Sequence, residues 1–215
     1  SSVLLVDTRF TWPIFFILIL CLLFPFLDGI QFTFLGDSEV RLIENIQAIM
    51  LFLFAVTTYA YMKPKQLPQG QKQFWLWAAC WWLMLFGRST SWGRDYFPEV
   101  PKIYFRMISI VLIGSIVFPL LQSSLRQEIV RKFRTALIPV WGLVIAFLGL
   151  IISDAIEHYR FIATWVVDAN SNRNLMEELY EFPLIIGLFY VAFGLMRNDK
   201  FANDSSYLSH LNKKD

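Results

Sequence analysis

The sequence predicts an all-α membrane protein: a polytopic transmembrane bundle of six helices with both termini in the cytoplasm. Of its 215 residues, 56% are hydrophobic and only 17% are charged, whereas a soluble domain carries about 25% charged residues. The apolar residues gather in six nearly charge-free stretches, each close to the roughly 20 residues that a helix needs to cross a bilayer. The segments between these stretches carry a net positive charge on one predicted side of the membrane and a net negative charge on the other.

The six predicted spans follow one another with mostly short connections. The first is expected to be an uncleaved helix, because no small-x-small cleavage site follows it. The third and sixth charge-free stretches hold only 15 residues, too few for the bilayer core, so these two helices must extend past a charged residue. The expected spans are residues 10–28, 44–62, 72–91, 106–125, 135–154 and 178–197. A single domain, residues 1–200, holds all six, and a polar cytoplasmic tail follows at residues 201–215.

The distribution of charge sets the predicted orientation. With the N-terminus in the cytoplasm, the inner segments hold 12 basic and 5 acidic residues, and the outer segments hold 7 basic and 12 acidic residues. The net charges are then +7 inside and −5 outside. Because cytoplasmic loops of membrane proteins carry an excess of lysine and arginine, both termini are predicted to be cytoplasmic. The basic residues form no continuous stripe, so the expected partner is the lipid bilayer and no nucleic acid.

Two charged residues are expected about one helical turn inside the outer leaflet: Arg88 on the third span and Glu181 on the sixth. Ionisable groups at that depth usually face the bundle interior and mark functional sites. An ion pair between Arg88 and Glu181, with two hydrogen bonds from the guanidinium to the carboxylate, is therefore expected. The alternative is a purely structural bridge, or an Arg88 side chain that extends alone to the interface.

More polar residues are expected at the same outer edge. Near the end of the fifth span, two acids and a histidine share one helical face because they are three and four residues apart. The sixth span begins with several acids and the second span begins with one. The residues concerned are Glu44, Asp154, Glu157, His158, Glu177, Glu178 and Glu181.

Three interpretations of these acids stay open. A divalent metal could bind, because one histidine with carboxylates suits zinc, manganese or iron, although the spacing fits no established metal motif. Its ligands would be Asp154, His158, Glu178 and Glu181. Alternatively, crowded carboxylates and a histidine could act as general acids and bases; the candidate catalytic residues are Glu181, His158, Asp154 and Glu44. In the third interpretation, the acids merely complement a helix dipole or form a solvated helix end.

The loop after the third span reads R-S-T-S-W-G-R-D-Y-F-P from Arg88 to Pro98. Trp92 is an interfacial anchor by residue type, Gly93 permits a turn, and Arg94 with Asp95 could hold the loop or clamp an anionic headgroup. Arg88, Arg94 and Trp92 are therefore the candidate residues for binding an anionic substrate.

This loop and the start of the sixth span resemble a class of uncharacterised bacterial integral membrane proteins. Proteins of that class carry a loop like E-L-S-W-G-[QR] and a later E-E-x-x-E at the start of a final helix. The matching positions are Ser91, Trp92, Gly93, Arg94, Glu177, Glu178 and Glu181. Ser89 or Thr90 stands where the pattern has its glutamate. The resemblance implies a multi-pass protein of the bacterial inner membrane with no assigned activity.

Two classes of function are compatible with these features. The favoured class is non-catalytic: a transport or channel element, or a membrane subunit whose acidic outer edge docks a membrane or periplasmic protein. Small residues on the fifth and sixth spans, among them Gly142, Gly149 and Gly187, could be faces of a homo-oligomer. The alternative is a membrane-embedded hydrolase or transferase acting on a lipid or lipid-linked envelope substrate. Haem and nucleotides are not expected, since His158 is the only histidine near a span and nucleotide-binding motifs are absent.

Overall fold

The computed structural model describes residues 5–27, 38–94, 96–158 and 173–211. In this part of the chain it confirms the predicted all-α class, with seven α-helices, short 3₁₀ turns and one pair of two-residue strands. Four helical stretches are long and apolar enough to cross a membrane, which is the pattern of a multi-pass membrane protein. They are Val40–Gln66, Lys102–Leu121, Val140–Glu157 and Arg173–Asn203.

In the described residues, two of the six predicted spans are not among these four stretches, because one helix is too short and the other is not apolar enough. Helix α1 (Trp12–Leu27) has only 16 residues, about 24 Å of helix at 1.5 Å per residue. Helix α3 (Gln69–Ser89) has 21 residues, but it begins with a polar Q-G-Q-K-Q segment and is rich in tryptophan, a residue that concentrates at membrane interfaces. The count of six spans and the cytoplasmic position of the termini therefore stay predictions.

The packing divides the chain into two units, and residues of α2 (Ser38–Met62) and α8 (Arg173–Leu211) belong to both. Unit 1 comprises Ser1–Asp7, Met50–Ile138 and Ala192–Asp215, and unit 2 comprises Thr8–Ile49 and Pro139–Val191. Because α8 continues to Leu211, the predicted tail of residues 201–215 is helical as far as the structure describes it.

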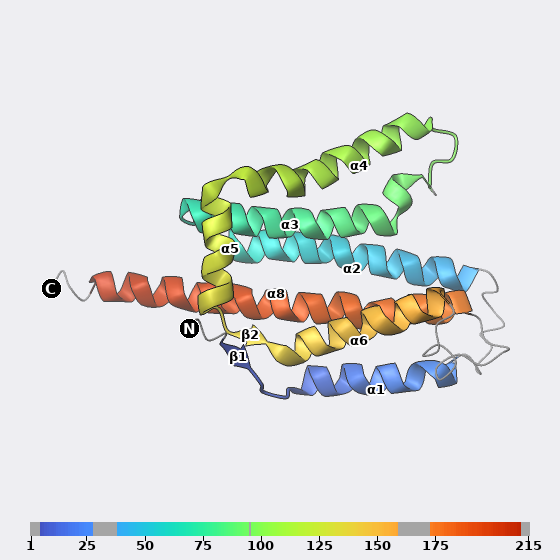
Figure 1. The fold of residues 1–215 in the computed structure, drawn as a ribbon, viewed down its shortest axis with the longest axis horizontal. Helices are drawn as coiled ribbons and strands as arrows, with labels where there is room; N and C mark the ends of the chain where they lie inside the picture. The colour runs from blue at the N-terminus through green and yellow to red at the C-terminus, as the bar shows by residue number, and fades with distance from the viewer. Residues whose placement is uncertain (1–4, 28–37, 95, 159–172, 212–215) are drawn as a thin grey trace. The chain divides into compact units, whose positions relative to one another are not determined.

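In unit 1, α3 packs beside α4 (Lys102–Val117), and α5 (Ser123–Thr135) runs across their direction (Figure 1). Helix α4 passes into a 3₁₀ turn, Phe118–Leu121, because the proline of this turn has no N–H group to continue the helical hydrogen bonds. The predicted span of residues 106–125 is therefore divided among α4, this turn and the start of α5.

Helix α5 is amphipathic, and its buried face carries charge. Glu128 and Lys132 are both buried. The Lys132 ammonium group pairs with Asp199 on α8 and lies 3.7 Å from a carboxylate oxygen of Glu128. The indole N–H of Trp75 on α3 donates a hydrogen bond to the Asp199 carboxylate at 2.8 Å. Three helices of unit 1 therefore meet at one buried charge cluster, which holds α5 in place.

In unit 2, α1 packs on α6 (Val140–Glu157), and glycines bring α6 close to α8. A Cβ atom at Gly149 would lie 2.6 Å from the backbone nitrogen of Leu184. A Cβ atom at Gly187 would lie 2.7 Å from the backbone nitrogen of Ala146. Because only glycine permits such an approach, the small residues pack α6 against α8 within the chain. Their role as faces of a homo-oligomer stays a prediction.

Candidate functional site

The predicted site residues fall in different units. Arg88, Trp92 and Arg94 belong to unit 1. The acidic candidates and the histidine belong to unit 2: Glu44, Asp154, His158, Glu178 and Glu181. An ion pair between Arg88 and Glu181 would join the two units, and it stays a prediction.

At the end of α6, the structure brings Asp154, Glu157 and His158 together. The Nδ1 atom of His158 lies 3.3 Å from Asp154 Oδ1 and 3.8 Å from Glu157 Oε2. One ligand atom from each residue lies within 4.8 Å of the other two. All three side chains are open to solvent, from 37% exposed for Asp154 to 59% for Glu157. In the described part of the chain, Glu178 and Glu181 are not members of this group.

Glu178 has a different environment at the start of α8. Its backbone carbonyl accepts a hydrogen bond from the side-chain amide of Gln47 on α2 at 2.7 Å, and Gln47 is fully buried. A buried amide in an apolar helix needs such a partner, because an unpaired polar group away from water is costly. Gln47 therefore ties the start of α2 to the start of α8 within unit 2.

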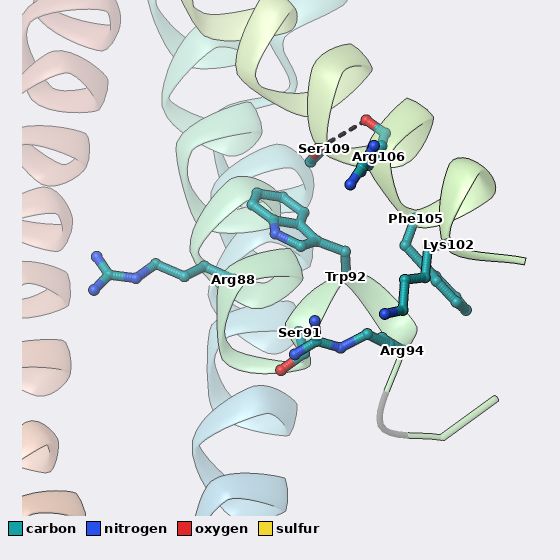
Figure 2. A pocket seen from close by; sticks show the side chains of 8 residues that line it. All are labelled: Arg88, Ser91, Trp92, Arg94, Lys102, Phe105, Arg106 and Ser109. Atoms are coloured by element: carbon teal, nitrogen blue, oxygen red, sulfur yellow. Dashed lines mark hydrogen bonds between the residues drawn. The ribbon is translucent and has the colours of Figure 1, made fainter. Parts of the chain in front are cut away.

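A pocket of about 460 Å³ opens in unit 1 where α3 ends and α4 begins (Figure 2). Its volume lies within the range of about 300–1,000 Å³ that is usual for ligand pockets. Basic, hydroxyl and aromatic side chains line it: Arg88, Ser91, Trp92, Arg94, Lys102, Phe105, Arg106 and Ser109. No acidic side chain is among these lining residues, and Asp95 lies outside the described part of the chain.

The turn after α3 places Trp92 in this pocket. Ser91, Trp92 and Gly93 have positive φ angles of 47°, 61° and 96°, a left-handed conformation that costs a non-glycine residue about 1–2 kcal/mol. The Trp92 ring packs against Gly87, where a Cβ atom would lie 2.8 Å from the ring. The Trp92 ring thus lies against Gly87 and forms one wall of the pocket.

The residues that α4 contributes share one face of the helix. Lys102, Phe105, Arg106 and Ser109 are related by spacings of three and four residues. Phe105 is buried, whereas Lys102 and Arg106 are exposed. Lys102 begins α4, and the positive end of the helix dipole disfavours a cation there. A bound anion would be stabilised by that dipole and by both cations.

The side chains in the pocket do not all point into it. Figure 2 shows Arg94, Lys102 and Arg106 arranged around the Trp92 side chain, whereas the Arg88 guanidinium points away from them. The stem of Arg88 therefore helps to shape the pocket, and the charge in the pocket comes from Arg94, Lys102 and Arg106.

Sequence reasoning selected Arg88, Trp92 and Arg94 and missed the α4 residues. Two features of the sequence could have identified them. Lys102 and Arg106 are four residues apart at the start of the predicted fourth span, and both lie on the side that was predicted to be the acidic one. Basic residues that depart from the overall charge bias are candidates for binding an anion.

The chain matches no family model, no curated protein and no solved structure. The resemblance to bacterial integral membrane proteins accordingly stays a prediction.

Proposed function

We propose that this chain is a non-catalytic membrane protein that binds an anionic, phosphate-bearing ligand in the pocket between α3 and α4. The observation that carries the proposal is that Arg94, Lys102 and Arg106 line one accessible pocket whose described lining includes no acid. Lys102 and Arg106 are one helical turn apart and repel each other, and a ligand with two or more negative charges removes that repulsion. Guanidinium groups match phosphate oxygens in geometry as well as in charge.

The aromatic residues support binding of a ligand larger than a single phosphate. Trp92 and Phe105 form apolar walls next to the cations, and such walls lower the local dielectric and strengthen electrostatic attraction. A volume of about 460 Å³ also leaves room for groups attached to the phosphate. Binding of such a ligand is compatible with a role as a membrane subunit or as a transport element.

We further propose that the protein lies in the bacterial inner membrane with both termini in the cytoplasm. The charge difference between the predicted inner and outer segments supports this orientation. The pocket would then open toward the periplasmic side, because it lies where α3 ends and α4 begins.

Isothermal titration calorimetry of the purified protein with inorganic pyrophosphate tests the binding function. We expect saturable binding that weakens by about tenfold in Arg106→Gln, a loss of about 1.4 kcal/mol, which is typical for a charged hydrogen bond. Arg197→Gln is the matched control, because Arg197 is exposed on α8 and does not line the pocket. Equal pyrophosphate affinities in wild type, Lys102→Gln and Arg106→Gln would contradict the proposal.

The group of Asp154, Glu157 and His158 favours a second candidate function, divalent metal binding at the end of α6. Its ligand atoms are close enough to share one ion, and a histidine with two carboxylates is a common set for zinc or manganese. A bound metal could serve the alternative prediction of a hydrolase or transferase. Elemental analysis of the purified protein tests it: a metal present in wild type and lost in His158→Ala supports this function.

A further inference from the structure

We infer that the ligand of the pocket is an anionic phospholipid of the surrounding bilayer, with its phosphate at Lys102 and Arg106 and an acyl chain along α4. This inference rests on the proposed binding function and specifies the class of ligand. It differs from binding of a water-soluble phosphate compound, which would need the basic residues alone.

An exposed apolar stripe on α4 continues directly from the cations. Ile110, Ile113 and Val117 follow Arg106 at spacings of four, three and four residues, so all four lie on one side of the helix. The three apolar residues are 68%, 46% and 54% exposed. From Arg106 to Val117 the stripe is about 16 Å long at 1.5 Å per residue, close to half of a bilayer core of about 30 Å. Its length therefore fits one acyl chain in one leaflet.

Aromatic residues indicate that the cations lie at the depth of lipid headgroups. Tyr96, Phe97 and Tyr104 are 52%, 62% and 57% exposed, and they stand in the chain just before and within the first turn of α4. Exposed tyrosine and other aromatic residues collect where the hydrocarbon meets the headgroups. Lys102, which lies between Phe97 and Tyr104 in the sequence, is then level with lipid phosphates.

The charge pattern favours an anionic lipid over a zwitterionic one. Lys102 and Arg106 line the pocket with Arg94, and no acidic residue among the described lining residues could hold a positively charged choline group. A lipid whose headgroup keeps a net negative charge gains attraction from each basic residue near the membrane surface. The surface thus selects phosphatidylglycerol over phosphatidylcholine with the same acyl chains.

Native mass spectrometry of the detergent-purified protein tests the inference with three probes: phosphatidylglycerol, phosphatidylcholine with the same chains, and glycerol 1-phosphate. We expect phosphatidylglycerol to bind about tenfold more tightly than either other probe, because only it satisfies both the cations and the stripe. Arg106→Gln should abolish the preference for phosphatidylglycerol over phosphatidylcholine. Ile113→Asn should weaken phosphatidylglycerol binding, whereas Val111→Asn, an exposed position on another side of α4, should leave it unchanged.

The outcomes separate the inference from the proposed function. If glycerol 1-phosphate and phosphatidylglycerol bind equally well and both depend on Arg106, the pocket binds anions and the lipid inference is wrong. If phosphatidylglycerol and phosphatidylcholine bind equally in wild type, the inference is likewise wrong. If neither pyrophosphate nor phosphatidylglycerol binds in an Arg106-dependent way, both proposals fail. The comparison of the three probes uses wild-type protein, so it gives a result even where a variant does not fold.

Discussion

The ammonium group of Lys132 on α5 forms an ion pair with the carboxylate of Asp199 on α8, and the Lys132 side chain is only 5% exposed. The other oxygen of this carboxylate accepts the indole N–H of Trp75 at 2.8 Å. Lys132 Nζ also lies 5.4 Å from the ring centroids of Phe74 and Trp75, within the range of cation–π attraction. These groups stabilise the buried Lys132 cation, and Lys132 in turn neutralises the Asp199 carboxylate.

Replacing Lys132 by methionine should destabilise the protein by about 3–5 kcal/mol, because it leaves the Asp199 carboxylate buried without its cation, whereas Glu128 keeps its ion pair with Arg131. Thermal unfolding in detergent measures the effect. Arg134→Met, at an exposed position on the same helix, is the control and should change the unfolding temperature little. Equal unfolding temperatures for the two variants would show that the cluster contributes nothing to stability.

The same lysine predicts how stability changes at alkaline pH. Burial lowers the pKa of the Lys132 ammonium group below its usual value, and the hydrogen bond to Asp199 offsets part of this effect. At pH values between the pKa of Lys132 in the folded protein and its pKa in the unfolded protein, the unfolded chain binds more protons than the folded chain. Raising the pH through this range therefore increases the free energy of unfolding. We expect the gap in unfolding temperature between wild type and Lys132→Met to widen from about pH 7 to about pH 10. A gap that narrows over this range would contradict the direction of the pKa change.

A methyl group at Gly87 should disturb the pocket. In Gly87→Ala the new Cβ atom would lie 2.8 Å from the Trp92 ring and 3.1 Å from Leu112, so Trp92 must shift. We expect weaker binding of inorganic pyrophosphate in calorimetry, by about tenfold. Gly70→Ala is the matched control, since its Cβ atom would make only ordinary contacts at 3.6 Å or more. Unchanged affinity in Gly87→Ala would mean that the position of Trp92 does not matter for binding.

Gly149→Ala should separate α6 from α8 in unit 2. The added Cβ atom meets the backbone nitrogen of Leu184 at 2.6 Å and the carbonyl oxygen of Tyr180 at 2.9 Å. Backbone atoms cannot rotate away as a side chain can, so we expect a loss of about 1–3 kcal/mol and a lower unfolding temperature. Gly70→Ala again serves as the control. A Gly149→Ala protein as stable as this control would indicate that the two helices separate at little cost.

The class of the protein and the character of its segments could be read from local sequence. Hydropathy and helical periodicity depend on neighbouring residues alone, so the stretches around α2, α4, α6 and α8 were predictable as apolar helices. The loop after α3 was also recognisable as a polar site, since it combines Trp92 with two arginines next to an apolar helix. Hydropathy did not predict that Pro119, in the 3₁₀ turn Phe118–Leu121, divides the predicted fourth span.

The sequence by itself therefore determined an all-α chain with apolar helices suited to a membrane and a basic loop after α3. Only the tertiary structure decided which charged residues meet. Left-handed residues at Ser91 and Trp92 reverse the chain, and this reversal brings Arg94 to Lys102 and Arg106 across a turn that hydropathy does not describe. Likewise, Lys132 and Asp199 are far apart in the sequence, and the crossing of α5 over its neighbours makes them partners. Composition reports how much charge a chain carries, whereas backbone geometry and packing set where that charge collects.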